Sequence, residues 1–221
     1  MSINTEKTQS ENSADEIVCC KAALRKHMKQ ILSDIYSSGL HEEKSRAAAD
    51  RFFTGNLYKD CESVFAFVSF GTEISTLSLL EKLIADGKKT AVPVCRNGNL
   101  VFKWLENARP LESQLEKGSF GILEPLDSLK EADVLPETTV LLMPGLAFSE
   151  NGGRLGRGKA FYDKFLADKD SADGGFTAVC GFCFDEQIIE DVPVCSTDRM
   201  VTHIVSDKRF VNCSHVRTNK K

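Results

Sequence analysis

The stretch Ser63-Val-Phe-Ala-Phe-Val-Ser69 is a short run of mostly apolar residues that favour β-strands, and it decides the fold class. Beyond it, apolar residues from Ile74 to Ile84 recur at three- and four-residue spacing, which predicts a helix that Gly87 ends. Thr90-Ala-Val-Pro-Val94 is a second predicted strand. Because a strand, a helix and a strand follow one another within about thirty residues, the stretch predicts a βαβ unit, with helices packed on a parallel sheet.

The same patterns extend this α/β class to both sides of the unit and leave the order of the strands open. Upstream, apolar spacing predicts helices over 17–35 and 42–53. Downstream, it predicts further strands over 139–143, 176–184 and 203–206, and a helix over 159–166. With no internal repeat, we expect one domain, residues 16–212, between a disordered polar tail at 1–15 and a polar C-terminal tail at 213–221.

Charge and composition limit the partners of the chain. The formal net charge of -4 argues against a general nucleic-acid binder, which needs an excess of Lys and Arg to offset phosphate charge. No apolar run approaches the roughly 18 residues of a membrane span, and the polar, acidic N-terminus is unlike a secretory or mitochondrial signal. We therefore expect a cytoplasmic protein with reduced cysteines, no membrane contact and no nucleic-acid partner.

One segment combines glycines and cations in the way that an anion site requires. It reads Met143-Pro-Gly-Leu-Ala-Phe-Ser-Glu-Asn-Gly-Gly-Arg-Leu-Gly-Arg-Gly-Lys-Ala-Phe-Tyr-Asp163. Its glycines let the backbone approach a phosphate and turn N–H groups inward. Arg154, Arg157 and Lys159 add positive charge, and the following helix start adds unpaired N–H donors. The segment predicts a phosphate site, against the alternative of a glycine-rich surface loop with solvated cations.

The segment only partly fits the P-loop pattern. Gly153 to Lys159 matches G-x-x-x-x-G-K, but Ala160 stands where a P-loop needs Ser or Thr to bind magnesium. A metal ligand must then come from elsewhere, and Asp163, one helical turn beyond Lys159, is the nearest carboxylate. The pattern therefore favours a phosphate site of another class.

At these residues the sequence resembles the 5-formyltetrahydrofolate cyclo-ligase family, also called methenyltetrahydrofolate synthetases. The run from Pro144 to Phe148 resembles its Pro-Gly-x-x-Phe lead-in, and Gly152 to Asp163 resembles its signature Gly-x-Arg-Leu-Gly-x-Gly-x-Gly-Tyr-Tyr-Asp. The match covers about residues 20–207, because further stretches resemble the family in order: Lys21-Ala-Ala-Leu-Arg25, Ser69-Phe-Gly-Thr-Glu73-Ile74, Gly121-Ile-Leu-Glu-Pro125 and Thr197-Asp198.

The resemblance implies a three-layer α/β fold, with a mostly parallel sheet and flanking helices, similar to the sugar-phosphate isomerase and CoA-transferase group. It implies Mg²⁺- and ATP-dependent cyclisation of 5-formyltetrahydrofolate to 5,10-methenyltetrahydrofolate, with release of ADP and phosphate. Lys159, Arg154 and Arg157 would stabilise the transferring phosphoryl group. The implied contacts are Lys21, Arg25 and the run Arg154, Leu155, Gly156, Arg157, Gly158, Lys159, Ala160, Phe161 and Tyr162 for ATP; Val68, Glu73, Arg157, Gly158, Lys159, Ala160 and Phe161 for the folate; and Asp163 and Asp198 for the metal.

The sequence departs from the family pattern at three positions and leaves two other functions open. Ala160 and Phe161 replace a glycine and a tyrosine, and Thr202 stands where a second aspartate often follows. These changes favour a nucleotide-binding regulatory protein that has lost turnover. The partial P-loop favours a small-molecule kinase. We expect a monomer, with a dimer as the alternative.

Several of these residues also have a simpler interpretation. Lys21 and Arg25 share one helix face, which by itself is typical of a solvated surface. Glu73 follows a strand end, where an acidic residue commonly begins a helix. Cys180 and Cys183 have C-x-x-C spacing, but in a strand such residues point to opposite faces, so we expect buried thiols rather than a zinc site.

Overall fold

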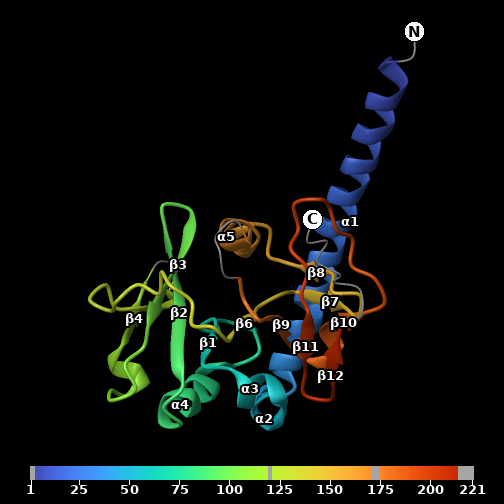
Figure 1. The fold of residues 1–221 in the computed structure, drawn as a ribbon. Helices are drawn as coiled ribbons and strands as arrows, with labels where there is room; N and C mark the ends of the chain where they lie inside the picture. The colour runs from blue at the N-terminus through green and yellow to red at the C-terminus, as the bar shows by residue number, and fades with distance from the viewer. Residues whose placement is uncertain (1–2, 119–120, 171–174, 214–221) are drawn as a thin grey trace.

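The computed structural model describes residues 3–118, 121–170 and 175–213 (Figure 1). Its α-helices are α1 (Ile3–Ser37), α2 (His41–Thr54), α3 (Asn56–Asp60), α4 (Leu77–Ala85) and α5 (Phe161–Asp170), and short 3-10 helices lie at Leu111–Ser113 and Asp185–Gln187. Its strands are β1 (Ser63–Phe65), β2 (Lys89–Arg96), β3 (Asn99–Trp104), β4 (Leu115–Lys117), β5 (Leu123–Pro125), β6 (Thr139–Met143), β7 (Ala147–Ser149), β8 (Arg154–Leu155), β9 (Ala178–Phe182), β10 (Ile188–Ile189), β11 (His203–Val205) and β12 (Phe210–Asn212).

A seven-stranded sheet in the order β12-β11-β9-β6-β1-β2-β3 forms the centre of the molecule (Figure 1). β1 pairs in parallel with β2 on one side and β6 on the other, and the parallel pairing continues to β9 and β11. Only the two edge strands, β3 and β12, are antiparallel. The mostly parallel sheet predicted from the βαβ pattern is therefore confirmed.

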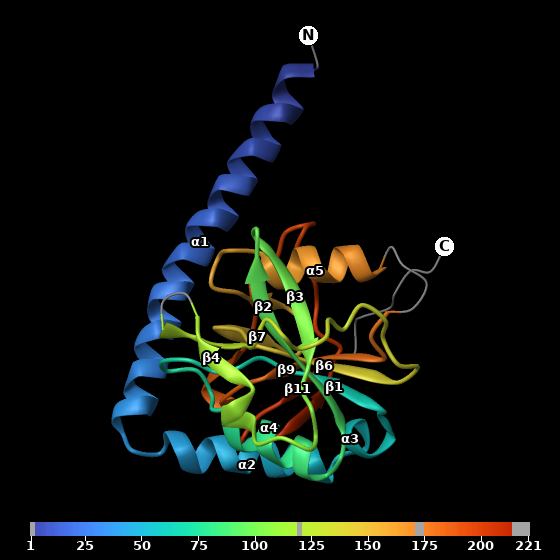
Figure 2. The same cartoon turned by 90° about the vertical axis from the view of Figure 1, so that its left-hand side faces the viewer.

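Helices cover both faces of this sheet because its central strands are apolar on both faces. Val64 and Val140 lie in one apolar cluster with residues of α1, α2 and α4. Phe65 and Leu141, the next residues along each strand, lie in a second cluster with Phe165 of α5. Figure 2 shows α5 above the sheet and α2 and α4 below it, so the three-layer α/β fold is confirmed.

Two features of the fold are absent from the sequence prediction. β2 and β3 form a hairpin, and Asn97 and Gly98 at its turn both have positive φ, of 51° and 80°. An Asn-Gly pair between apolar runs is a strong signal for such a turn, so the sequence does carry the information. Strands β7 and β8, which form a small sheet with β10, interrupt the path from β6 to α5 that the sequence predicts as one loop.

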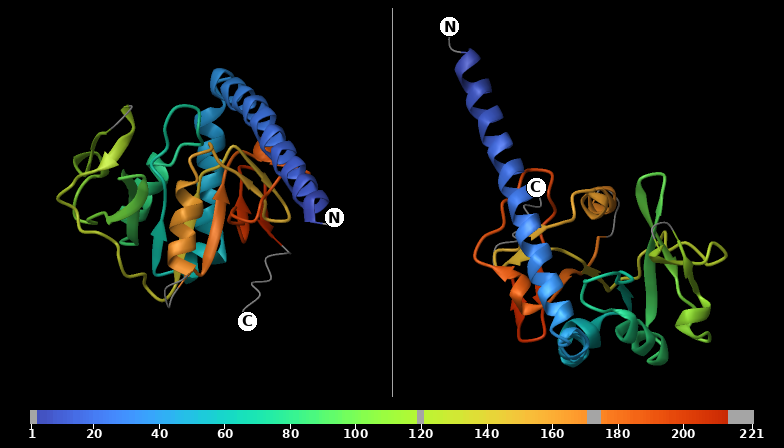
Figure 3. Two further views of the ribbon diagram at one scale, coloured as in Figure 1. Left: turned by 90° about the horizontal axis from the view of Figure 1, so that it is seen from above. Right: turned by 180° about the vertical axis from the view of Figure 1, so that it is seen from behind.

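The first helix is longer than predicted. Residues 3–15, expected to belong to a disordered tail, form the first part of α1, which projects beyond the other elements (Figure 3). No glycine or proline interrupts the chain before Gly39, so nothing local stops the helix from extending upstream. Gly39 itself, with a φ of 78°, follows the end of the helix as predicted. Of the predicted C-terminal tail at 213–221, residues 214–221 lie outside the described residues, and the extent of the domain stays a prediction.

None of the helices in the described parts of the chain is long and apolar enough to cross a membrane.

Candidate functional site

The glycine-rich segment lies beyond the carboxyl end of β6, partly as a hairpin and partly as a loop. β7 pairs with β8, and the Asn151 side chain closes their turn by accepting bonds from Ser149 Oγ at 2.6 Å and from the Gly153 amide at 3.1 Å. The loop then runs from residue 156 to Phe161, where α5 begins two residues later than predicted. The carboxyl edge of a parallel sheet is where α/β proteins commonly bind ligands.

Arg154 lies under this loop and is paired with Asp163. Their side chains are 2.7 Å apart, and the whole Arg154 residue is only 6% exposed. The same Oδ1 of Asp163 accepts the Arg199 amide at 3.0 Å. The buried Nε of Arg154 has no hydrogen-bond partner among the described residues. The sequence predicts that Arg154 binds phosphate, with a solvated cation as the alternative, whereas in the structure its buried guanidinium is paired with Asp163.

Arg157 connects the loop to Glu73, a residue 84 positions away in the sequence. Arg157 Nε donates to Glu73 Oε1 at 2.8 Å, and Glu73 Oε2 accepts the Phe70 amide at 3.2 Å. The Arg157 guanidinium also lies over the Phe70 ring, 4.7 Å from its centre. The two segments that the resemblance assigns to the folate are therefore joined directly.

Burial changes the acidity of two groups at this junction. It raises the pKa of Glu73, against the opposing effects of Arg157 and the Phe70 amide. Burial also raises the pKa of the Tyr162 phenol, and the nearby Glu73 carboxylate raises it further. The Tyr162 hydroxyl therefore stays protonated at neutral pH and is a possible hydrogen-bond donor.

Glu73→Gln is expected to become progressively more stable than the parent as pH rises. A carboxyl group whose pKa is higher folded than unfolded binds its proton more tightly in the folded state, so it costs stability above its unfolded pKa of about 4.3. Glutamine removes that dependence. Denaturant unfolding of both proteins at pH 4 and pH 7 measures the difference, and a difference that is equal at both values, or larger at pH 4, contradicts the expectation.

Two basic residues of α1 reach the site, one helical turn apart as predicted. Lys21, which is 8% exposed, contacts the Asp198 carboxylate, and Asp198 Oδ2 also accepts the Cys195 amide at 2.6 Å. Burial alone would raise the pKa of Asp198, but the bonds from Lys21 and Cys195 outweigh it and lower that pKa. Arg25 Nε donates to the Gly156 carbonyl at 3.0 Å. The solvated-surface interpretation of Lys21 and Arg25 is therefore wrong.

The end of the loop, residues 158–160, is exposed. In the described part of the chain, no hydrogen bond or ion pair joins the Lys159 side chain to another residue. Gly158 and Ala160 flank it with left-handed φ values of 103° and 52°. Glycine adopts such values readily, whereas alanine is strained there. Position 160, where the family pattern has glycine, is thus one where the backbone conformation favours glycine.

Ala160→Gly is expected to stabilise the protein by about 0.5–1 kcal/mol, because relief of the left-handed strain exceeds the entropy that glycine gains in the unfolded chain. For a domain of this size this raises Tm by roughly 1–4 °C. The matched control is Ala108→Gly, an exposed turn residue without positive φ, which is expected to lose stability. An equal loss in both variants contradicts the expectation.

Asp163 and Asp198, the predicted magnesium ligands, lie on adjoining segments, since the amide next to Asp198 binds Asp163. The bonds above use one oxygen of each carboxylate, Oδ1 of Asp163 and Oδ2 of Asp198. The described residues contain no group of three or more His, Cys, Asp or Glu able to hold a metal. Magnesium commonly takes one or two carboxylates, with phosphates and water as the other ligands, so this donor set fits an ion that arrives with a nucleotide.

The remaining predicted residues contribute through the fold rather than through exposed side chains. Val68 and Leu155 are 7% and 1% exposed and lie in the apolar core. Thr202 bonds both the amide and the carbonyl of Val179 through its hydroxyl, at 3.0 and 2.9 Å, which continues the strand pairing. Cys180 and Cys183 are free and buried, as expected for structural thiols.

The structure adds residues that the sequence prediction missed. Phe70 is 40% exposed beside Arg157, and it falls within a quoted stretch without being assigned a contact. His41 and Ser45 of α2 bind the loop that carries Glu73. Their signal is polarity at buried positions: with Ala48 and Phe52 they follow the three- and four-residue spacing of the apolar face of α2.

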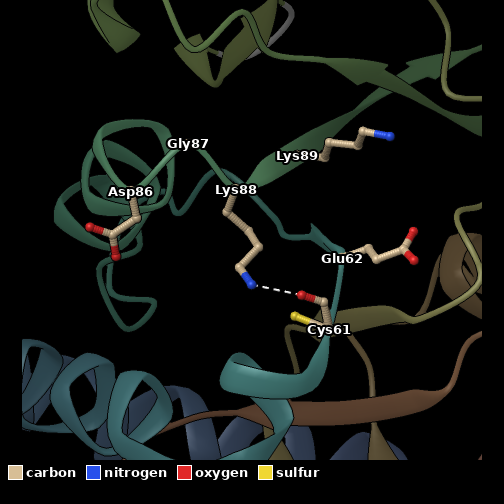
Figure 4. Close-up of a pocket in the computed structure, with 6 residues that line it drawn as sticks. All are labelled: Cys61, Glu62, Asp86, Gly87, Lys88 and Lys89. Atoms are coloured by element: carbon tan, nitrogen blue, oxygen red, sulfur yellow. Dashed lines mark hydrogen bonds between the residues drawn. The ribbon is translucent and has the colours of Figure 1, made fainter.

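A separate cavity of about 350 Å³ lies at the other edge of the sheet (Figure 4). Its lining includes Cys61 and Glu62, which precede β1, and Lys89, the first residue of β2. Lys88 Nζ donates to the Cys61 carbonyl there at 2.6 Å, as Figure 4 shows. Because the strands are parallel, this edge is opposite to the one that carries the glycine-rich loop.

Comparison with known proteins shows the family of the chain. Residues 18–207 match the 5-formyltetrahydrofolate cyclo-ligase family. The 5-formyltetrahydrofolate cyclo-ligase of Escherichia coli (strain K12) is 32% identical over 171 residues, covering 76% of this chain and 90% of that protein. Its counterpart in Mycolicibacterium smegmatis is 30% identical over 172 residues, covering 76% of this chain and 85% of that protein.

Among solved structures, the 5,10-methenyltetrahydrofolate synthetase of Aquifex aeolicus has the same fold, with a TM-score of 0.72 at 23% identity, covering 91% of this chain and 96% of that one. The family match over residues 18–207 includes every segment that meets at the carboxyl edge of the sheet, from Lys21 to Asp198. The chain therefore belongs to the 5-formyltetrahydrofolate cyclo-ligase family.

Proposed function

We propose that this protein is an ATP-dependent ligase that closes 5-formyltetrahydrofolate to 5,10-methenyltetrahydrofolate. The observation that carries the proposal is the ion pair between Arg157 and Glu73, at 2.8 Å. It joins the glycine-rich loop to the loop after β1, so that a phosphate held by one segment lies beside a ligand held by the other. Membership of the family supplies the substrate class.

The reaction needs activation of an amide-like formyl group. Its carbon is a poor electrophile and its oxygen a poor leaving group. Transfer of the γ-phosphoryl group breaks the bond to ADP and forms a bond to the formyl oxygen. N10 then attacks the formyl carbon and loses its proton, the carbon–oxygen bond breaks, and phosphate leaves with the oxygen. The five-membered ring of the methenyl product is then closed.

The protein supplies position and charge for this transfer. Lys159 is exposed at the end of the loop and has no partner among the described residues, so it is the cation best placed to follow the moving phosphoryl group. Arg157 binds Glu73 through Nε, so the two terminal nitrogens of its guanidinium remain for a ligand. Tyr162 contributes a protonated hydroxyl near Glu73. Lys21 and Arg25 hold α1 against Asp198 and Gly156, on the side of the site that we assign to ATP.

Asp163 and Asp198 are the residues that would hold Mg²⁺, together with phosphate oxygens and water. When bound, the ion neutralises charge on the phosphates. We place the reaction in the cytoplasm, carried out by a monomer.

Incubation of the purified protein with MgATP and 5-formyltetrahydrofolate tests the proposal, with methenyl product followed by its absorbance and ADP measured in parallel. Stoichiometric methenyl product and ADP support it. ADP without methenyl product would instead identify a small-molecule kinase. ATP binding with neither product, at high enzyme concentration, would identify a regulatory protein without turnover.

A further inference from the structure

The loop that carries Glu73 is closed at its base by its own side chains. The Ser69 amide donates to Thr76 Oγ1, and the Thr76 amide donates to Ser69 Oγ, both at 3.0 Å. Thr76 Oγ1 also donates to the Phe67 carbonyl at 2.7 Å. These reciprocal bonds fix where the loop begins and ends. Within the loop the Glu73 amide donates to the Phe70 carbonyl at 3.3 Å, but the Glu73 carbonyl is held from another element.

Helix α2 holds that part of the loop through two buried side chains. His41 Nε2 lies 2.6 Å from the Glu73 carbonyl, and since a carbonyl only accepts, the imidazole donates. Ser45 Oγ accepts the Ser75 amide at 2.9 Å and donates to the His41 carbonyl at 2.7 Å. His41 is 8% exposed and Ser45 1%, so water does not compete for these bonds.

The imidazole is itself fixed in place. The His41 ring meets Tyr36 and Phe184 edge-on, with centroids 5.2 and 5.4 Å away. Its two neighbours come from α1 and from the segment after β9, so three parts of the fold set the position of one donor. A donor held this firmly transmits its position to the Glu73 backbone.

We infer that His41 and Ser45 are positioning residues, which hold the Glu73 backbone so that its carboxylate meets Arg157 and the formyl-folate substrate. The inference rests on the proposed function and extends it to α2. The two bonds hold the chain at residues 73 and 75, on both sides of Ile74, which is buried in the core. Loss of either bond is expected to let the carboxylate move away from Arg157, while the bond from Arg25 to Gly156 still holds the glycine-rich loop to α1.

Ser45→Ala tests the inference against a matched control, Ser63→Ala. Ser63 is also fully buried, and its hydroxyl bonds Thr139 Oγ1 at 2.8 Å, but it lies at the amino end of β1, away from the site. Ser45→Ala is expected to raise KM for 5-formyltetrahydrofolate about 5- to 10-fold and to leave KM for ATP within about twofold. Ser63→Ala is expected to lower Tm without changing either KM. An unchanged folate KM in Ser45→Ala, or an equal rise in both variants, overturns the inference.

Variants of His41 provide a rescue test. His41→Leu removes the donor to the Glu73 carbonyl and is expected to raise the folate KM about tenfold. His41→Gln keeps an N–H donor and is expected to recover most of that loss. If both variants show the same KM, the imidazole acts through packing alone and the inference is wrong for His41.

Turnover by the unmodified protein separates failure of this inference from failure of the proposed function. If that protein makes no methenyl product, the proposed function is rejected. The hold of His41 and Ser45 on the Glu73 loop is then tested separately, by amide hydrogen exchange. The Ser75 amide is then expected to exchange at least tenfold faster in Ser45→Ala than in Ser63→Ala. Equal exchange rates in the two variants would show that Ser45 does not hold the loop, and would overturn the inference.

Discussion

Lys159→Ala is expected to lower kcat about 30- to 1000-fold, which corresponds to about 2–4 kcal/mol of transition-state stabilisation. The Lys159 side chain is exposed and has no partner in the described part of the chain, so its charge is available to a ligand. For the same reason the variant is expected to keep the Tm of the parent. Steady-state kinetics and thermal unfolding of one preparation measure both effects.

Lys164→Ala is the matched control for this prediction. Lys164 is an exposed lysine of α5, within five positions of Lys159, and the structure gives its side chain no part in the site. Its removal changes net charge equally and is expected to leave kcat within about twofold. Near-normal turnover in Lys159→Ala, or equal losses in the two variants, would show that Lys159 does not contact the transferring group.

Asp163→Asn is expected to lower kcat by a similar factor, about 30- to 1000-fold, and also to destabilise the fold by about 2 kcal/mol. Arg154 is 6% exposed, and asparagine leaves that buried guanidinium without its only described anionic partner. The activity loss has a second cause, since Asp163 is also a proposed ligand of Mg²⁺. Denaturant unfolding and kinetics distinguish this variant from Lys159→Ala, which affects activity alone.

The double variant Arg154→Met/Asp163→Leu separates the two roles of Asp163. Replacement of a buried ion pair by apolar residues of similar volume commonly restores stability. We expect the double variant to regain most of the stability lost in Asp163→Asn and to remain inactive. Recovery of activity along with stability would mean that Asp163 serves only to hold Arg154, and the metal assignment would then be lost.

The sequence predicts the layers of this fold well because they follow from local patterns. The run around Val64 is apolar on both faces, and the spacing from Leu77 to Ile84 has one apolar face; a parallel sheet under helices satisfies both. Strand order is not local. The β1–β6 pairing joins residues 76 positions apart, such as Ser63 and Thr139, and no periodicity encodes it. The Asn97-Gly98 turn between β2 and β3 is by contrast a strong local signal, so this hairpin is predictable from the sequence.

The same distinction applies to the site. The glycine-rich loop is contiguous, so the sequence itself shows its glycines and cations together. The pairing of Arg154 with Asp163 depends on the β7–β8 hairpin, which turns Arg154 inward under the loop. The importance of His41 depends on a contact 32 positions away in sequence. Burial of a polar residue on an otherwise apolar helix face is the signal that would have pointed to it.

The docking of α1 has a consequence for how the protein is made. Lys21 contacts Asp198 across 177 positions, and Arg25 contacts Gly156 across 131. A ribosome adds about 5–20 residues per second, so roughly 9–35 s pass between synthesis of Lys21 and of its partner. The helix has neither contact available until Gly156 has been made, and the contact with Asp198 becomes possible only at the end of that time. The contact between Lys21 and Asp198 is therefore among the last of the site to form, and a nascent chain released before Asp198 would lack it.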